Sequence, residues 1–291
     1  MRLALGTAQF GLKYGLANPR EEMSKKEASK IIQYARFSKI ELIDTAIAYG
    51  SSEEVLGTIG VDGFKVVTKL PPIPEKIDDV HSWILKQVTQ SLSRLGIQSL
   101  YGLLLHRSED LLGKHGVELT KSLKVIKLCG LVEKIGVSIY DPVDLAKLIK
   151  VMRLDIVQAP VNLIDRRLEH SNWMQRLYSE GIEIHARSIF LQGLLLLPQK
   201  KIPDKFSRWS YLWSSWHEEL KNKGVSQLAA CLSYPLSLKE IDRVIIGIDC
   251  LNQLKQLIIC TNTNQPLEDW GFMISEDKSL INPANWHELS N

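Results

Sequence analysis

The chain has 291 residues, of which 45% are hydrophobic, and its 36 Lys and Arg side chains outnumber its 33 Asp and Glu side chains by three. This near balance excludes the strongly basic surface of a nucleic-acid-binding protein, and the length suits one large α/β domain. Four cysteines without a CxxC pair or a neighbouring histidine pair indicate neither a zinc site nor a disulfide framework, so we expect a cytoplasmic protein without a metal.

The chain also has no sequence signal for a membrane. Its first residues lack the long apolar stretch of a signal peptide. The longest apolar run, 189–198, contains Gln192 and reaches about half of a membrane span. We therefore expect no membrane partner, and the sequence leaves a monomer and a small homo-oligomer both open.

Short apolar runs alternate with longer amphipathic segments along the whole chain, a pattern typical of a parallel sheet surrounded by helices. The predicted strands lie near residues 2–6, 41–44, 64–69, 99–105, 133–137, 154–158, 182–186 and 242–246. Eight parallel strands are the number that closes a barrel, so we predict a (β/α)8 TIM barrel.

Helices are expected between these strands. They lie near residues 24–37, 51–59, 78–95, 117–129, 141–150, 166–180, 209–234 with a break at Gly224, and 250–260. Ser24 and Glu27 form a capping-box pattern, and Asp141-Pro142 supplies a cap with proline in the first turn. Because no repeat or linker divides the chain, residues 1–291 are expected to form a single domain with an irregular tail from about residue 261 that packs over the barrel.

Polar residues follow most of the predicted strands at their C-terminal ends, where a barrel of this kind carries its chemistry. They are Asp44, Thr68-Lys69, His106-Arg107, Ser138, Gln158 and Arg187-Ser188. Each one alone is explained more readily as a cap, a turn residue or a solvated strand end. An aspartate, a lysine and a histidine brought to one mouth can shift one another's pKa values, so the set is a candidate active site.

The stretch Asp44-Thr45-Ala46-Ile47-Ala48-Tyr49-Gly50 resembles the aldo-keto reductase family. The resemblance runs from about Leu5 to Leu257 and includes Gly6-Thr7-Ala8, Val67-Thr68-Lys69, Leu104-Leu105-His106, Gly136-Val137-Ser138 and Gln192-Gly193-Leu194-Leu195. It implies NADP(H)- or NAD(H)-dependent reduction of a small-molecule carbonyl substrate. The four catalytic positions of the family match Asp44, Tyr49, Lys69 and His106.

This chemistry has its own physical requirements. Delivery of hydride to a carbonyl carbon builds negative charge on the oxygen, so an acid must stand beside that oxygen. Tyrosine has an ordinary pKa of about 10, and the ammonium of Lys69, held by Asp44, is expected to favour the ionised phenol of Tyr49. His106 can donate a hydrogen bond to the same oxygen. No metal is required.

The resemblance also implies a cofactor site. Ser138 and Gln158 would hold the nicotinamide carboxamide, while Ser188 and the loop from Leu191 to Gly193 would lie along the pyrophosphate. Gly6 and Thr7 would complete this site. The chain departs from the family in two places. Ile139 replaces the usual asparagine. Arg187 replaces a tyrosine that in many members stacks on the nicotinamide, and its guanidinium plane can also stack on the cofactor there, at the cost of a positive charge beside a ring that is cationic when oxidised. The sequence of residues 187–193 is similar to that of a bacterial branch of the family associated with surface-sugar biosynthesis. This similarity suggests a sugar-derived carbonyl substrate.

The segment after the last predicted strand bears on cofactor preference. Members that bind a 2'-phosphate usually carry Lys or Arg where this chain has Gly247, Asp249 and Gln253. Asp249 would repel a 2'-phosphate but could accept from a ribose hydroxyl. We therefore expect NADH to be tolerated unless a distant cation replaces the missing one. The loop lysines that could do so are Lys200, Lys201 and Lys205.

Other groups have less specific interpretations. Trp209, Trp213 and Trp216 share one helical face, which indicates either core packing or the wall of a substrate pocket. Five histidines show no ligand spacing and are expected to be structural: His115, His170, His185, His217 and His287.

Two other functions fit the same sequence. The first is a redox-sensing or regulatory subunit, a barrel that binds nicotinamide nucleotide and turns over slowly. The other is an isomerase or aldolase that uses Lys69 for a Schiff base, which is disfavoured because Asp44 should keep that lysine protonated.

Overall fold

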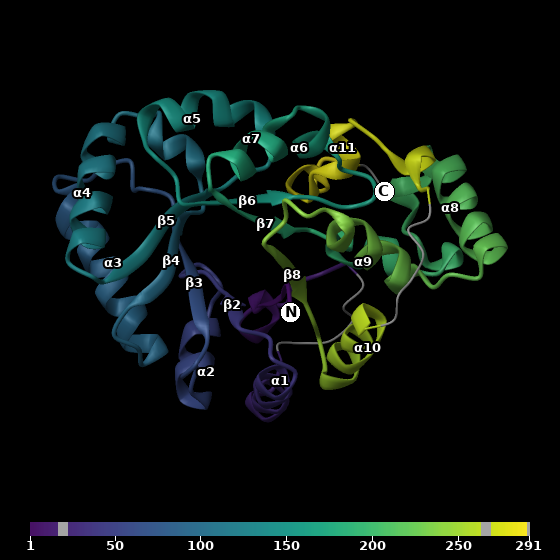
Figure 1. Ribbon diagram of the computed structural model, residues 1–291, viewed down its shortest axis with the longest axis horizontal. Helices are drawn as coiled ribbons and strands as arrows, with labels where there is room; N and C mark the ends of the chain where they lie inside the picture. Colours follow the sequence, from purple (N-terminus) through teal and green to yellow (C-terminus); the bar gives the residue numbers. More distant parts are fainter. Residues whose placement is uncertain (17–22, 263–268, 290–291) are drawn as a thin grey trace.

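The computed structural model describes residues 1–16, 23–262 and 269–289, and shows a closed barrel of eight parallel strands in the order β1 to β8, surrounded by helices (Figure 1). The predicted TIM barrel is therefore confirmed, and every strand lies within two residues of its predicted range. The strands are β1 (Leu3–Gly6), β2 (Leu42–Asp44), β3 (Lys65–Leu70), β4 (Leu100–Leu105), β5 (Val132–Ser138), β6 (Ile156–Pro160), β7 (Glu183–Arg187) and β8 (Arg243–Gly247).

The helices follow the strands with caps that the sequence predicts. They are α1 (Lys25–Phe37), α2 (Ser52–Ile59), α3 (Val80–Leu95), α4 (Gly116–Leu128), α5 (Leu145–Val151), α6 (Arg167–His170), α7 (Trp173–Ser179), α8 (Ser210–Lys223), α9 (Gln227–Ser237), α10 (Leu251–Asn262) and α11 (Lys278–Ile281). Ser24 accepts a hydrogen bond from the backbone N–H of Glu27, and Asp141 accepts one from Val143.

Two predicted helices differ from the structure, one in its interior and one at its C-terminal end. The predicted helix 166–180 is divided into α6 and α7, because Asn172 adopts a left-handed conformation with φ +61°. The predicted break at Gly224 is confirmed, with φ +64° at the end of α8. Helix α9 then runs three residues beyond its predicted end at 234, with Pro235 in its last turns.

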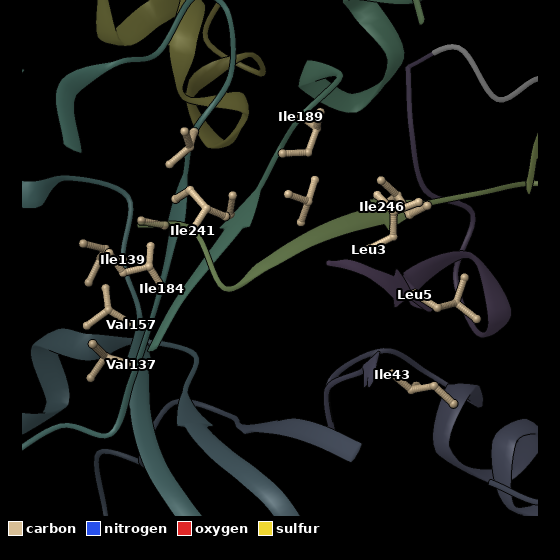
Figure 2. Close-up of a cluster of buried hydrophobic side chains, with 14 of the residues drawn as sticks. Leu3, Leu5, Ile43, Val137, Ile139, Val157, Ile184, Ile189, Ile241 and Ile246 are labelled. Atoms are coloured by element: carbon tan, nitrogen blue, oxygen red, sulfur yellow. The ribbon is translucent and has the colours of Figure 1, made fainter. Parts of the chain in front are cut away.

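The hydrophobic core has two parts because alternate residues of each strand face opposite sides of the barrel wall. Residues that face the helices form the larger part, with Leu3, Leu5, Ile43, Val157 and Ile246 among them (Figure 2). The smaller part fills the barrel interior and consists of Ala4, Leu42, Val67, Leu104, Ile156 and Ile245. The interior is thus packed, and the open end of the barrel lies above this layer.

The described part of the tail, 269–289, is not wholly irregular and packs along α8 (yellow in Figure 1). It contains α11 and two 3-10 turns, η7 (Gly271–Met273) and η8 (Pro283–Asn285). The ring of Trp270 meets that of Trp216 edge-on, with centroids 5.0 Å apart. Residues 263–268 of the predicted tail lie outside the described residues. Within the described part of the chain, no helix is both long enough and apolar enough to span a membrane.

The tryptophan face is core rather than pocket wall. Trp213 and Trp216 are buried, and their indole N–H groups donate to the backbone oxygens of Phe206 and Leu195. Trp209 instead donates to the Asp277 carboxylate at 3.2 Å.

Candidate active site

A cavity of about 1090 Å³ opens at the C-terminal ends of the strands. Nearly all of the predicted site residues line it, and they come from the ends of several different strands. Those that do are Gly6, Thr7, Asp44, Tyr49, Lys69, His106, Ser138, Gln158, Arg187, Ser188, Gly193, Gly247, Asp249 and Gln253. Leu191 is the exception, because it is fully buried in the core and does not line the cavity.

A buried ion pair stands at the floor of the cavity. Lys69 Nζ lies 2.7 Å from Asp44 Oδ2 and donates a second bond of 2.8 Å to the backbone oxygen of Thr45. The other carboxylate oxygen of Asp44 accepts from the Gln158 amide at 2.7 Å. Both ends of the pair are therefore fixed, and the Lys69 side chain is only 1% exposed.

Tyr49 lies beside this pair on the loop between β2 and α2. Lys69 Nζ is 5.3 Å from the centre of the Tyr49 ring, on its face. The His106 ring meets the Tyr49 ring edge-on, with centroids 5.9 Å apart. Lys69 and His106 are thus brought together with the Asp44–Tyr49 segment from three different parts of the sequence.

Two glycines allow the Tyr49 loop to approach the chain after β1. A Cβ atom on Gly11 would lie 2.1 Å from the backbone oxygen of Tyr49, and one on Gly50 would lie 2.2 Å from that of Gly11. Gly50 also has φ +53°, a conformation that favours glycine. Close backbone packing therefore fixes the loop that carries Tyr49.

The start of α2 is held by polar side chains below the cavity. The hydroxyl of Ser52 donates to the backbone oxygen of Thr7 at 2.9 Å. Buried Glu53 accepts from Thr68 and Ser91, both at 2.7 Å, and pairs with Arg94 at 2.6 Å. These contacts join α2 to β3 and α3, so the Tyr49 loop is anchored at both ends.

The site keeps Tyr49 protonated and His106 neutral. Burial, together with the charge of Asp44, raises the pKa of Tyr49 well above its ordinary value, and Arg187 opposes this effect. Burial and the charges of Lys69 and Arg187 lower the pKa of His106 to about 4. Burial lowers the pKa of Lys69, although the charge and hydrogen bond of Asp44 act in the opposite direction. The pKa of Tyr49 is thus raised rather than lowered, because burial outweighs the effect expected of a nearby ammonium.

The carboxamide-binding pair that the sequence predicts is preorganised. Ser138 Oγ donates to Gln158 Oε1 at 3.4 Å, at the ends of the neighbouring strands β5 and β6. Since the Gln158 amide nitrogen is committed to Asp44, the pair is joined to the ion pair of the cavity floor.

Arg187, the last residue of β7, is held against a residue that the sequence did not single out. Its guanidinium carbon lies 4.2 Å from the centre of the Tyr140 ring. It donates to the backbone oxygen of Ile139 at 2.9 Å and to Ser188 Oγ at 3.0 Å.

Sequence reasoning missed further lining residues that have no motif of their own. Among them are Gln9, Tyr14, Tyr140, Ser226, Gln227 and Gln256. Tyr140 lies two residues after Ser138, which was a usable signal. Tyr14 and Gln227 belong to a loop and a helix whose approach to the cavity depends on the tertiary fold.

The far end of the cavity lies at the loop between β8 and α10. The backbone N–H of Asp249 donates to Gln253 Oε1 at 2.7 Å, and Gln253 Nε2 donates to Asp249 Oδ2 at 3.3 Å. Of the three loop lysines, Lys201 lines the cavity. Lys205 instead donates to the backbone oxygen of Trp286 at 3.4 Å.

The donor set suits a dinucleotide. The cavity is lined by both Tyr49 and Gln253 and is large for a drug-sized ligand alone. Its lining includes the hydroxyl of Ser138 and the amide of Gln158, together with the carboxylate of Asp249 and the amide of Gln253. A Cβ atom on Gly247 would lie 2.7 Å from Gln9 Nε2, so the Gln9 side chain would have to move if this residue were not glycine.

Comparisons with known proteins agree with this geometry. A family model described as the aldo/keto reductase family matches residues 2–271. A holo-form aldo-keto reductase from Bacillus halodurans superposes with a TM-score of 0.74 and 19% identity, covering 100% of this chain and 92% of the other. A Pseudomonas aeruginosa protein described as a candidate aldo-keto reductase superposes with a TM-score of 0.66 and 21% identity. The match covers 89% of this chain and 88% of the other. No curated protein sequence matches the chain.

Proposed function

The chain belongs to the aldo/keto reductase family, and on this premise we propose that Tyr49 donates the proton when an aldehyde or ketone is reduced in the cavity. Family membership makes the protein an NAD(P)H-dependent oxidoreductase that acts on carbonyl groups. The observation that carries the proposal is the meeting of Tyr49, Lys69, Asp44 and His106 at one wall of one cavity.

A nicotinamide cofactor held in this cavity would supply the hydride for the carbonyl carbon. Tyr49 keeps its proton until negative charge develops on the carbonyl oxygen, because burial raises the pKa of its phenol. The charge that then remains on Tyr49 is stabilised by the ammonium of Lys69. Asp44 and the Thr45 carbonyl hold that ammonium in place.

His106 is proposed to orient the substrate. Its ring is neutral near pH 7, since its pKa is lowered to about 4, so it carries one N–H that can donate to the carbonyl oxygen. A neutral ring also avoids a third positive charge beside Lys69 and Arg187.

Four further residues are proposed to hold the cofactor at its two ends. Ser138 and Gln158 are placed for the nicotinamide carboxamide, and Asp249 and Gln253 for the adenosine ribose. The support is the hydrogen bond within each pair. Because these side chains are already ordered, little conformational entropy is lost when a ligand binds to them.

The substrate is proposed to be a sugar-derived carbonyl. The support is the polar character of the cavity wall near Tyr49, where the hydroxyls of Tyr14 and Tyr140 and the amide of Gln192 can bond several substrate hydroxyls.

The test of function is oxidation of NADPH or NADH by purified protein in the presence of aldehydes and aldoses, followed by loss of reduced-nicotinamide absorbance. Multiple turnovers per protein are expected. A single turnover followed by a stall with tightly held nucleotide would instead indicate a redox-sensing subunit and would contradict the proposal.

A further inference from the structure

Arg187 is a rigidly held cation at the reaction centre. It stacks on Tyr140 and is fixed by the Ile139 carbonyl and the Ser188 hydroxyl. A guanidinium has five N–H donors in a planar fork, and these two bonds leave the remaining donors unused within the described residues. Because the Arg187 guanidinium is already held in place, it loses little conformational entropy when a further acceptor binds to it.

No carboxylate of the described residues pairs with Arg187. Other buried or stacked arginines of the chain do have such partners, such as Arg94 with Glu53 at 2.6 Å and Arg208 with Asp277 at 3.2 Å. The Asp44 carboxylate cannot serve, because its oxygens are bound by Lys69 and Gln158.

The centre of the site consequently carries one excess positive charge. Lys69 is paired with Asp44, whereas Arg187 has no carboxylate partner among the described residues. Arg187 lines the same cavity as Tyr49 and His106, and its charge acts on the pKa values of both. A partly buried cation without a counter-charge is costly, so an anionic group is the expected complement.

We propose that Arg187 recognises a carboxylate or phosphate group carried by the carbonyl substrate, so that the natural substrate class is an anionic aldehyde or ketone such as a sugar acid or a sugar phosphate. The inference rests on the proposed function only in assuming that the carbonyl is reduced in this cavity. It makes the stacked, forked guanidinium a specificity determinant, because such a fork binds two oxygens of a carboxylate or phosphate at once.

The kinetic test compares matched aldehydes with and without the anion. The carboxylate arm uses 4-carboxybenzaldehyde against methyl 4-formylbenzoate, and the phosphate arm uses glyceraldehyde 3-phosphate against glyceraldehyde. We expect at least about a tenfold advantage in kcat/KM for the anionic member of one pair, as charge-assisted hydrogen bonds are worth. The arm that shows the larger ratio identifies the anion.

The variants test whether Arg187 is the source of that advantage. In Arg187→Gln the ratio should fall to about one, and in Arg187→Lys, which keeps the charge but loses the fork, it should fall partway. The matched control is Arg208→Gln, which removes the same charge from an arginine that also stacks on an aromatic ring, at 3.9 Å from Trp209, but lies outside the cavity. Its ratio should equal that of the unmodified protein. A ratio that survives in Arg187→Gln, or that is close to one in the unmodified protein, would overturn the proposal.

A binding measurement separates this proposal from the proposed function. Dissociation constants of benzoate, inorganic phosphate and NADPH are measured by calorimetry for the protein and its Arg187→Gln variant. In the variant we expect the dissociation constant of benzoate or phosphate to rise by at least about tenfold, and that of NADPH to rise by much less. Equal weakening of NADPH and the anions would assign Arg187 to the cofactor and overturn the proposal. Because this assay needs no turnover, it decides the role of Arg187 even if no aldehyde is reduced.

Discussion

Tyr49 has a neighbourhood that suits a proton donor rather than a resident phenolate. Its ring lies against the Lys69 ammonium and the His106 ring, while burial raises the pKa of its phenol. The cation is therefore better placed to stabilise the phenolate that forms in the reaction than to create one beforehand. Removal of either Lys69 or Asp44 would leave the other partner as a buried charge without compensation.

Replacement of Tyr49 tests this role. We expect Tyr49→Phe to lower kcat for aldehyde reduction by at least about a hundredfold, since general acid catalysis contributes factors of that order. The dissociation constant of NADPH should change little, because the ring is retained. Tyr14→Phe is the matched control, as Tyr14 also lines the cavity, and its loss of kcat should be far smaller. A Tyr49→Phe enzyme with full activity would exclude the mechanism.

His106 makes the free energy of unfolding depend on pH. Its pKa is about 4 in the folded chain and about 6.5 when unfolded, so between these values only the unfolded state binds the proton. The contribution of His106 is thus fully present above pH 6.5 and is lost as pH falls towards 4. We expect His106→Gln to lose stability less steeply across this window.

Urea unfolding at several pH values between 4 and 7 measures the effect. The difference between the two proteins removes the contributions of other groups. Parallel profiles would show that the His106 ring titrates normally in the folded state.

At the scale of elements, the turn between β2 and α2 matters most, because it delivers Tyr49. Its position depends on the contact between Gly11 and the Tyr49 backbone and on the anchors at Ser52 and Glu53. Removal of any of these would move Tyr49 without touching a reacting group.

Gly11→Ala is the direct test of this arrangement. The added methyl would lie 2.1 Å from the Tyr49 oxygen and 2.3 Å from the Ser52 nitrogen, so the backbone must shift. We expect a loss of about 1–3 kcal/mol in the free energy of unfolding, typical of overpacking, together with a lower kcat. Gly113→Ala is the control, since a methyl there would meet its nearest neighbour at an ordinary 3.6 Å. Equal behaviour of the two variants would show that the turn tolerates displacement.

The strands and most helix ends could be predicted because they depend on local signals. Apolar runs mark the strands, and side-chain caps such as Ser24 mark where helices begin. The split at Asn172 could not be predicted, because a left-handed asparagine inside an amphipathic segment leaves the hydrophobic pattern intact. Among site residues, those at strand ends were found, since the barrel gathers them. Tyr14 was missed because its place in the cavity depends on how a loop folds back.

At the scale of the whole molecule, the C-terminal segment pairs with two loops that lie far apart in the sequence. Lys278 pairs with Asp141 at 2.8 Å, next to Tyr140 and hence to the stacked Arg187. Asp277 pairs with Arg208, which lies in the 3-10 turn η6 (Asp204–Trp209). The segment therefore links the loop after β5 to the turn before α8.

Cofactor preference follows from how charge is distributed along the cavity. Selectivity for a 2'-phosphate normally depends on Lys or Arg at the last strand–helix loop, but this loop carries Asp249 and Gln253, bonded to each other. Of the lysines considered as replacements, Lys205 is bonded to the Trp286 carbonyl and only Lys201 lines the cavity. One exposed lysine on a short 3-10 turn, η5 (Gln199–Lys201), is a weak substitute for a bidentate arginine.

We therefore expect NADH to bind within about tenfold of NADPH, or about 1.4 kcal/mol. The measurement is the pair of dissociation constants at low and moderate salt, by cofactor fluorescence, for the protein and for Lys201→Gln. Any residual preference for NADPH should shrink in Lys201→Gln and with added salt, because a charge contact at an exposed site is screened. Lys205→Gln, which removes the same charge outside the cavity, should leave both constants unchanged. A hundredfold preference for NADPH that fades with salt and disappears in Lys201→Gln would show that the loop supplies the cation that the last strand lacks, and would exclude NADH tolerance.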